Sequence, residues 1–148
     1  ATKEVVGPAV MMERFLKKND EKVIACVYCG NGTYNENPEE IIRKITALAA
    51  KLKADAVICG PCFNYADYAA MAAAAAESIV KNTDIPAVAC MSKENADTIS
   101  AFKDKVAIVK GPKKGETGLN EALENLCVLA GQMADGKDTA ELKSRICY

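Results

Sequence analysis

The stretch AVICGPCFN at residues 56–64 decides how this chain is interpreted. Its first half is an apolar run of strand length, and its second half is a turn that carries two cysteines. The alanine-rich stretch that follows, up to residue 76, favours a helix. In α/β proteins, ligands collect where parallel strands end and helices begin, because free backbone N–H groups point into that crevice. The two thiols are therefore either part of a functional site or small core residues.

The same alternation of strand and helix recurs along the whole chain. Strands are expected at 22–28, 54–59, 87–91 and 105–110, and helices at 9–18, 38–52, 66–81, 93–102 and 116–133. The strands are almost continuously apolar, which is typical of a parallel sheet covered on both faces. The pattern predicts a three-layer α/β fold, Rossmann-like or flavodoxin-like, with a mainly parallel sheet between flanking helices. We expect a single domain over residues 1–148, with a polar C-terminal tail at 135–148.

Composition excludes several classes of function. The chain contains no histidine, which excludes Ser-His-Asp and Cys-His catalysis and every histidine-ligated metal. A net charge of -1 argues against a nucleic-acid partner. No apolar run reaches the roughly 18 residues that a membrane helix needs, so no membrane partner is expected. The seven cysteines are an odd number and lie mostly in apolar segments, which favours a reducing cytoplasm over a disulfide scaffold.

The tetrapeptide CGPC at residues 59–62 is identical to the redox motif of thioredoxin, and it also lies between a strand and a helix. A thiol at a helix N-terminus has a lowered pKa and is more reactive. The tryptophan that precedes the thioredoxin motif is absent, so two interpretations stay open: a redox pair, Cys59 and Cys62, or inert core thiols. Cys26 and Cys29 lie three apart on an expected strand and face opposite ways, so no metal site is predicted.

The carboxyl ends of parallel strands share one edge of the sheet, so the loops after the first three strands are expected to form one rim. Cys59 and Cys62 are the candidates for redox catalysis on this rim. The predicted ligand-binding residues are Cys29, Gly30, Asn31, Tyr34, Asn35, Glu36, Gly60, Phe63, Asn64, Tyr68, Cys90, Met91, Glu94 and Asn95.

Three of these loops resemble one protein family. Residues 29–37 (CGNGTYNEN) resemble the strand-end segment CGD-x-(Y/F)-F-N-E of the component B selenoprotein subunits of glycine, sarcosine and betaine reductases. Residues 58–68 (ICGPCFNYADY) resemble the family's AGPAFNAGRY, and residues 85–95 its IPAVTGMYPENPG. The order and spacing of all three agree, and the resemblance runs from about residue 6 to 131. The selenoprotein subunit of D-proline reductase is similar more remotely.

The resemblance implies an anaerobic, cytoplasmic amino-acid reductase system of the Stickland type. In that system a pyruvoyl-bearing partner subunit activates the substrate amine, and a selenocysteine of component B cleaves the C–N bond. The implied partners are other subunits of a reductase complex and a small amine or amino-acid substrate, with a homo-oligomer left open. No cofactor is expected on this chain, because the pyruvoyl group and the selenocysteine are expected on partner subunits.

Three departures from the family pattern qualify this expectation. The family's selenocysteine region has no counterpart here, and neither has the family strand that precedes the Gly-Pro helix. The two alanines of AGPA are Cys59 and Cys62 in this chain. We therefore expect a subunit or lobe of an amino-acid or amine reductase complex with a thiol-lined ligand site, in which the Cys59/Cys62 pair relays reducing equivalents. The alternatives are a non-catalytic binding or scaffold subunit and a stand-alone thiol–disulfide oxidoreductase.

Overall fold

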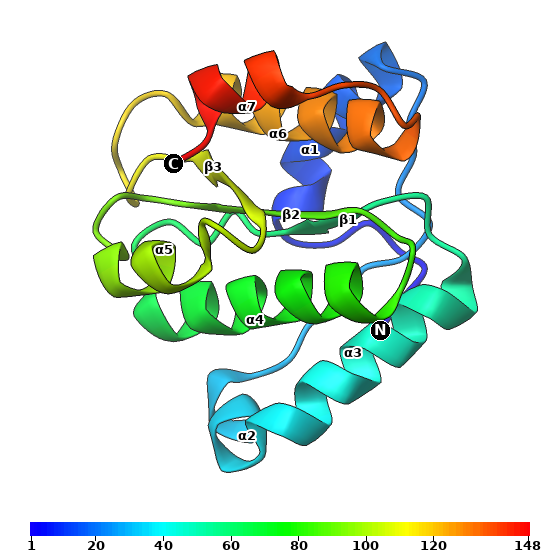
Figure 1. Ribbon diagram of the computed structural model, residues 1–148, viewed down its shortest axis with the longest axis vertical. Coiled ribbons are helices and arrows are strands. Elements are labelled where there is room, and N and C mark those ends of the chain that lie inside the picture. The colour runs from blue at the N-terminus through cyan, green and yellow to red at the C-terminus, as the bar shows by residue number, and fades with distance from the viewer.

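The computed structural model describes residues 1–148, arranged as three layers with a small sheet in the middle (Figure 1). The sheet has three parallel strands in the order β1-β2-β3. They are β1 (Val57–Cys59), β2 (Ala87–Met91) and β3 (Ala107–Lys110). The register pairs Ile58 with Val88 and Ala89 with Ile108. The predicted three-layer α/β architecture with a parallel sheet is confirmed.

Helices cover both faces of the sheet (Figure 1). On one face lie α3 (Pro38–Leu52), α4 (Ala66–Asn82) and α5 (Ala96–Phe102). On the other face lie α1 (Pro8–Lys18), α6 (Leu119–Ala134) and α7 (Ala140–Ile146). The short helix α2 (Asn31–Glu36) packs against α3 and α4. None of these helices is both long and apolar enough to cross a lipid bilayer.

Local sequence explains where the helices lie. Helix α3 begins at Pro38, whose fixed φ suits a first helical turn, and the side chain of Asn37 accepts a hydrogen bond from the Glu40 N–H at 3.4 Å. Helix α4 is rich in alanine, and its small side chains let the helix lie close to the sheet. Ala73 and Ala76 of this helix are completely buried.

The core consists of two clusters, one on each face of the sheet. Because successive side chains of a strand point to opposite faces, Ala89 and Met91 pack toward α4, whereas Val88 and Cys90 pack toward α6. All five residues of β2 are buried, as expected for a central strand covered by helices on both faces. The carboxyl ends of the strands, where the candidate site lies, are therefore supported by a packed core on both faces of the sheet.

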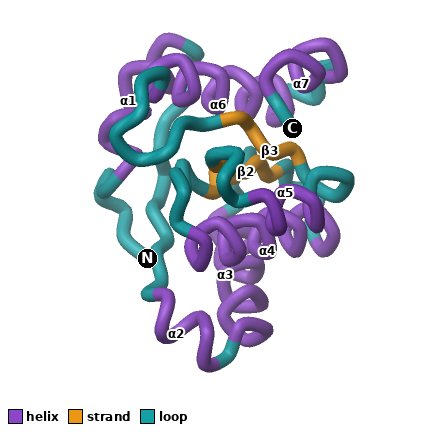
Figure 2. Tube along the Cα trace, turned by 90° about the vertical axis from the view of Figure 1, so that its left-hand side faces the viewer, coloured by secondary structure: helices purple, strands orange, loops and turns teal.

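The strand predicted at residues 22–28 is wrong. This segment is extended, but its only ladder contact is an isolated antiparallel bridge between Cys26 and Thr2. Ile24, Val27 and Tyr28 are 42%, 43% and 70% exposed. In Figure 2 the loop that joins α1 to α2 runs in teal past one side of the sheet. An apolar run becomes a strand only when a neighbouring backbone pairs with it, and β1 does not.

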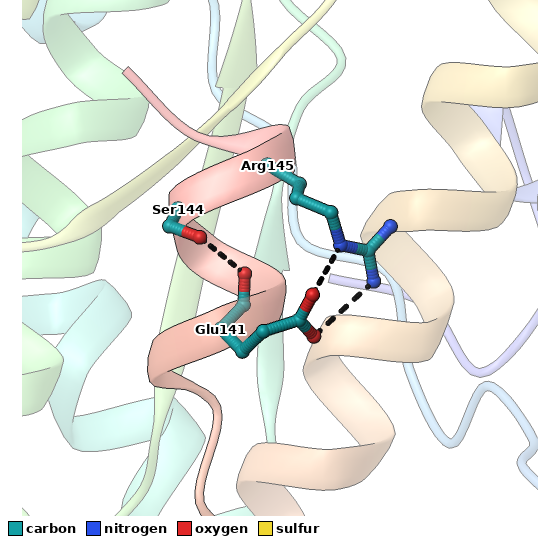
Figure 3. Close-up of polar contacts among 3 residues, drawn as sticks. All are labelled: Glu141, Ser144 and Arg145. Atoms are coloured by element: carbon teal, nitrogen blue, oxygen red, sulfur yellow. Dashed lines mark hydrogen bonds and ion pairs between the residues drawn. The ribbon is translucent and has the colours of Figure 1, made fainter.

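Two other segments differ from expectation. Residues 31–36, expected as loop, form helix α2. The expected polar tail contains helix α7, and its Ile146 is buried. The exposed side of α7 carries the polar residues: the Arg145 Nε donates to Glu141 at 2.8 Å, and the Ser144 hydroxyl donates to the Glu141 carbonyl at 2.6 Å (Figure 3). The C-terminal segment is thus amphipathic and docks on the fold.

Candidate functional site at the strand ends

The turn after β1 is clamped onto the end of β2. The Cys62 N–H donates to the Cys90 carbonyl at 2.8 Å. Gly60 has a φ of +131°, and a Cβ at this position would lie 2.7 Å from the same carbonyl oxygen, so only glycine fits. Phe63 also has a positive φ of 53°. The turn is therefore held in a conformation that the sequence motif alone does not specify.

The turn after β2 holds the turn after β1 through one buried amide. The Asn95 Nδ2 donates to the Phe63 carbonyl at 2.7 Å and to the Ser92 carbonyl at 3.4 Å. The Ser92 N–H donates to the Phe63 carbonyl as well, at 2.9 Å. The Ser92 hydroxyl makes a very short hydrogen bond to the Glu94 carboxylate, which lowers the pKa of Glu94. Asn95 is a positioning residue, and Glu94 stays exposed and ionised.

The turn after β3 and the C-terminus complete this rim. The Lys114 N–H donates to the Asn64 side-chain oxygen at 3.0 Å. The Met91 carbonyl accepts the Gly111 N–H at 2.9 Å and the Tyr148 hydroxyl at 3.1 Å. Among the predicted residues, the structure brings together Gly60, Phe63, Asn64, Cys90, Met91, Glu94 and Asn95 on this rim.

The thiols on the rim are buried and protonated. Cys62 and Cys90 are fully buried, and Cys59 is half-buried. Burial raises the pKa of Cys59 and of Cys90 to about 12, and that of Cys62 further. Helix α4 begins only at Ala66, so its N-terminus is not at Cys62. The helix-terminus activation on which the redox prediction rested is therefore missing.

A second group of predicted residues lines one end of a large open cavity of about 1910 Å³. Its members are Cys29, Gly30, Asn31, Cys59, Gly60 and Tyr68. Burial, followed by the neighbouring thiols Cys62 and Cys59, raises the pKa of Tyr68, whose hydroxyl stays protonated. Cys59 and Gly60 belong to both the cavity and the turn, so the rim and the cavity meet at the end of β1.

The remaining predicted residues lie on helix α2, away from the rim. Tyr34 is half-buried there, which raises its pKa, while Asn35 and Glu36 are exposed. Helix α2 packs against α3 and α4. The expected common rim therefore does not include them, because α2 follows an extended segment that is not part of the sheet.

Sequence reasoning missed three contributors to the rim: Ser92, Gly111 and Tyr148. Ser92 directly follows an expected strand, which was an available signal. A Cβ added at Gly111 would lie 2.9 Å from the Cys90 Sγ, so glycine is needed here for a close approach that only the fold reveals. All seven cysteines are free, and no three His, Cys, Asp or Glu side chains are grouped to hold a metal ion.

Comparison with known proteins identifies the family. The family model described as "Glycine/sarcosine/betaine reductase selenoprotein B" matches residues 1–145. This chain belongs to that family. It is 32% identical over 124 residues to the glycine reductase complex component B subunit gamma of Carboxydothermus hydrogenoformans, covering 84% of this chain and 28% of the relative. It is 27% identical over 132 residues to the sarcosine reductase complex component B subunit beta of Peptoclostridium acidaminophilum, covering 89% and 30%.

The relatives in this family are longer proteins, and this chain matches only a part of each of them. A third relative, the glycine reductase complex component B subunit gamma of Symbiobacterium thermophilum, is 29% identical over 133 residues, which are 90% of this chain and 30% of the relative. The chain thus spans less than a third of the length of these family members. No solved structure matches this selenoprotein B family chain significantly.

Proposed function

We propose that this chain acts as a lobe or subunit of an amino-acid or amine reductase complex of the glycine reductase type. The observation that supports the proposal is the family match over residues 1–145, together with relatives that are named as components of glycine and sarcosine reductase complexes. The proposed partners are other subunits of such a complex, and the proposed substrate class is a small amine or amino acid.

In this proposal, the chain binds and positions the substrate or a partner surface at the end of β1. The region offers both an open cavity end and exposed polar groups. Asn31 is exposed at the cavity end, and Tyr68 carries a hydroxyl that stays protonated and therefore able to donate. The Glu94 carboxylate, ionised and exposed on the adjoining rim, suits a positively charged amine.

We propose that the chemistry of C–N cleavage comes from outside these 148 residues. The sequence contains no selenocysteine, and the thiols nearest the cavity are held protonated by burial. A protonated thiol is neither a nucleophile nor an efficient partner in thiol–disulfide exchange. We therefore favour a binding lobe over the redox relay expected from the CGPC tetrapeptide.

Reconstitution tests this function. The complex would be assembled from purified subunits of one organism with and without this chain, and dithiol-dependent release of ammonia or amine would be followed with glycine, sarcosine and betaine. We expect turnover of at least one substrate to depend on the chain. If every substrate is reduced equally well without it, and the chain does not co-elute with the other subunits, the proposal is wrong.

The relay remains the second candidate function, because the CGPC tetrapeptide places two thiols beside the cavity end. It predicts that the assembled complex loses activity when Cys59 and Cys62 are both replaced by alanine. The binding-lobe proposal predicts unchanged activity of this variant, because binding needs only the shape of the turn and not its thiols.

A further inference from the structure

Two aromatic side chains lie together on the turn after β1. The ring centroids of Phe63 and Tyr65 are 6.2 Å apart, and the ring planes meet at 72°. Tyr65 is 43% exposed and Phe63 is half-buried, so solvent reaches the pair. Two rings set at a steep angle form a corner, and the negative faces of aromatic rings attract cations, with methylated ammonium groups as the best-known ligands. The pair Phe63/Tyr65 is therefore suited to a cationic group.

The turn after β2 holds Phe63 in place. The φ of Phe63 is 53°, a left-handed conformation that is unfavourable for a residue with a side chain. Such a conformation persists only where the surroundings enforce it. Here the Phe63 carbonyl accepts the Ser92 N–H at 2.9 Å and the Asn95 Nδ2 at 2.7 Å. The ring is thus presented from a fixed backbone, which lowers the entropy lost on binding.

Negative charge lies on both sides of the aromatic pair in the sequence of the site. Glu94 is exposed in the turn that holds Phe63, and its hydrogen bond with Ser92 lowers its pKa, so it is ionised at neutral pH. Asp67 is exposed in the first turn of α4, two residues after Tyr65. The segment AGPAFNAGRY, which this turn resembles, has alanine in place of Tyr65 and arginine in place of Asp67. Both differences favour a cationic ligand.

The chain's own cations leave the pair Phe63/Tyr65 free. The two cation–π contacts of the protein lie elsewhere, on Phe15 and Phe102. After the Ser92 bond, the charges of Lys113 and Lys93 also lower the pKa of Glu94, so two ammonium groups lie near this carboxylate. They suit the carboxylate of an amino acid. The surroundings of the pair thus match a zwitterion.

The carbonyl groups of the rim offer few free hydrogen-bond acceptors. A backbone carbonyl has two lone pairs. The Phe63 carbonyl already accepts two hydrogen bonds, and so does the Met91 carbonyl, from the Gly111 N–H and the Tyr148 hydroxyl. A primary ammonium group brings three N–H donors that need acceptors. Each N-methyl group removes one donor and adds apolar surface, so the rim suits a methylated ammonium better than a primary one.

We propose that the pair Phe63/Tyr65 binds the ammonium group of an N-methylated amino acid and selects it over glycine. The methyl groups pack on the rings, and Glu94 and Asp67 balance the positive charge. This inference rests on the proposed function and narrows its substrate class. The relatives are named for glycine and for sarcosine reductase complexes, so the family match does not separate these substrates.

A binding series that varies only the ammonium group tests the proposal. The ¹⁵N-labelled chain is titrated with betaine, sarcosine, glycine and tert-butylacetate, and its amide signals are followed by NMR. Tert-butylacetate has the shape of betaine with a carbon in place of the charged nitrogen. We expect the signals of residues 63–67 and 92–95 to shift and the affinity to fall from betaine through sarcosine to glycine. Betaine should bind at least about threefold more tightly than glycine and than tert-butylacetate.

Matched variants assign the selectivity to the aromatic pair. Tyr65→Ala should weaken betaine binding at least about threefold and abolish the preference over glycine, whereas Tyr65→Phe should keep both. Tyr28→Ala is the control, because Tyr28 is 70% exposed away from the rim and its loss should leave betaine binding unchanged. The amide spectra report whether each variant is folded. Failure of betaine to bind overturns the proposal, as do equal affinity for glycine, equal affinity for tert-butylacetate and equal affinity of the folded Tyr65→Ala variant.

Turnover of the reconstituted complex distinguishes failure of this site from failure of the proposed function. If turnover depends on the chain but is equally fast with Tyr65→Ala on betaine, sarcosine and glycine, the function stands and the aromatic selectivity is wrong. If the chain binds betaine selectively but no complex needs it for turnover, the site stands and the reductase function is wrong.

Discussion

The protonated state of the rim thiols gives a quantitative prediction about their alkylation. With a pKa of about 12, roughly one Cys59 thiol in ten thousand is ionised at pH 8, against about a quarter for an ordinary cysteine with a pKa near 8.5. Because the thiolate is the species that reacts, alkylation of Cys59 in the native protein should be on the order of two-thousandfold slower than in the unfolded chain. Cys62 is fully buried and should be slower still.

Timed iodoacetamide labelling followed by peptide mass spectrometry measures these rates residue by residue. The reference is the same chain unfolded in urea, where all cysteines react at ordinary rates. Between pH 7 and 9 the native Cys59 rate should rise about tenfold for each pH unit, because the thiolate fraction does so far below the pKa. If either thiol of the turn is labelled within tenfold of its unfolded rate at pH 8, or rapidly below pH 7, the burial argument is refuted.

Three further predictions concern stability and are checked by urea denaturation or thermal melting. Asn95→Ala removes the amide that donates to the Phe63 and Ser92 carbonyls and should lower the free energy of unfolding by about 1–3 kcal/mol. The control is Asn35→Ala on the exposed side of α2, which should change the free energy of unfolding by less than about 0.5 kcal/mol. Gly60→Ala should lower the free energy of unfolding by more than about 2 kcal/mol, because residue 60 has a positive φ and the added Cβ would lie 2.7 Å from the Cys90 carbonyl oxygen. Gly32→Ala is the control: a Cβ there would have nothing within 4 Å, so the substitution should be neutral or stabilise α2. Equal effects of the two substitutions would contradict the turn geometry. Burial and the Asp135 carboxylate raise the pKa of Glu21 to about 7, so the folded state binds a proton more tightly than the unfolded state. The free energy of unfolding should therefore fall as pH rises from about 4.5 to 7, by about 1 kcal/mol once the partial exposure of Glu21 is allowed for. Glu21→Gln should flatten that dependence.

The fold class was predictable because it depends on local patterns. The apolar runs at 57–59, 87–91 and 107–110 are short and bounded by turns, and the helix that begins at Pro38 has both a capping asparagine and a helical apolar stripe. These signals are contained within a few residues. The three-layer arrangement follows from their alternation.

The segment at 22–28 shows what local pattern cannot decide. Its sequence has the composition of a buried strand, yet Val27 and Tyr28 are exposed, and the segment makes only one isolated bridge, between Cys26 and Thr2. The sequence prediction failed here because β1 does not pair with this segment.

The chemistry of the candidate site was only partly predictable. The sequence placed Cys59, Cys62 and Cys90 near strand ends, which the structure shows. Their reactivity depends on burial, and burial is set by packing from α4 and from the turn after β2, which no motif encodes. Tyr148 donates a hydrogen bond to the Met91 carbonyl, 57 residues away in the sequence, so its place on the rim could be found only in three dimensions.

The measurement that tests the central claim most directly is turnover of the reconstituted reductase complex with the Cys59→Ala/Cys62→Ala double variant. The AGPA segment that this turn resembles has alanine at both positions, so we expect the turn to keep its shape. Circular dichroism and co-elution with the partner subunits would verify this. If the chain is a binding lobe with inert thiols, dithiol-dependent turnover will equal that of the wild type within about twofold. A loss of tenfold or more in a correctly assembled complex would contradict the account and assign the relay of reducing equivalents to this pair.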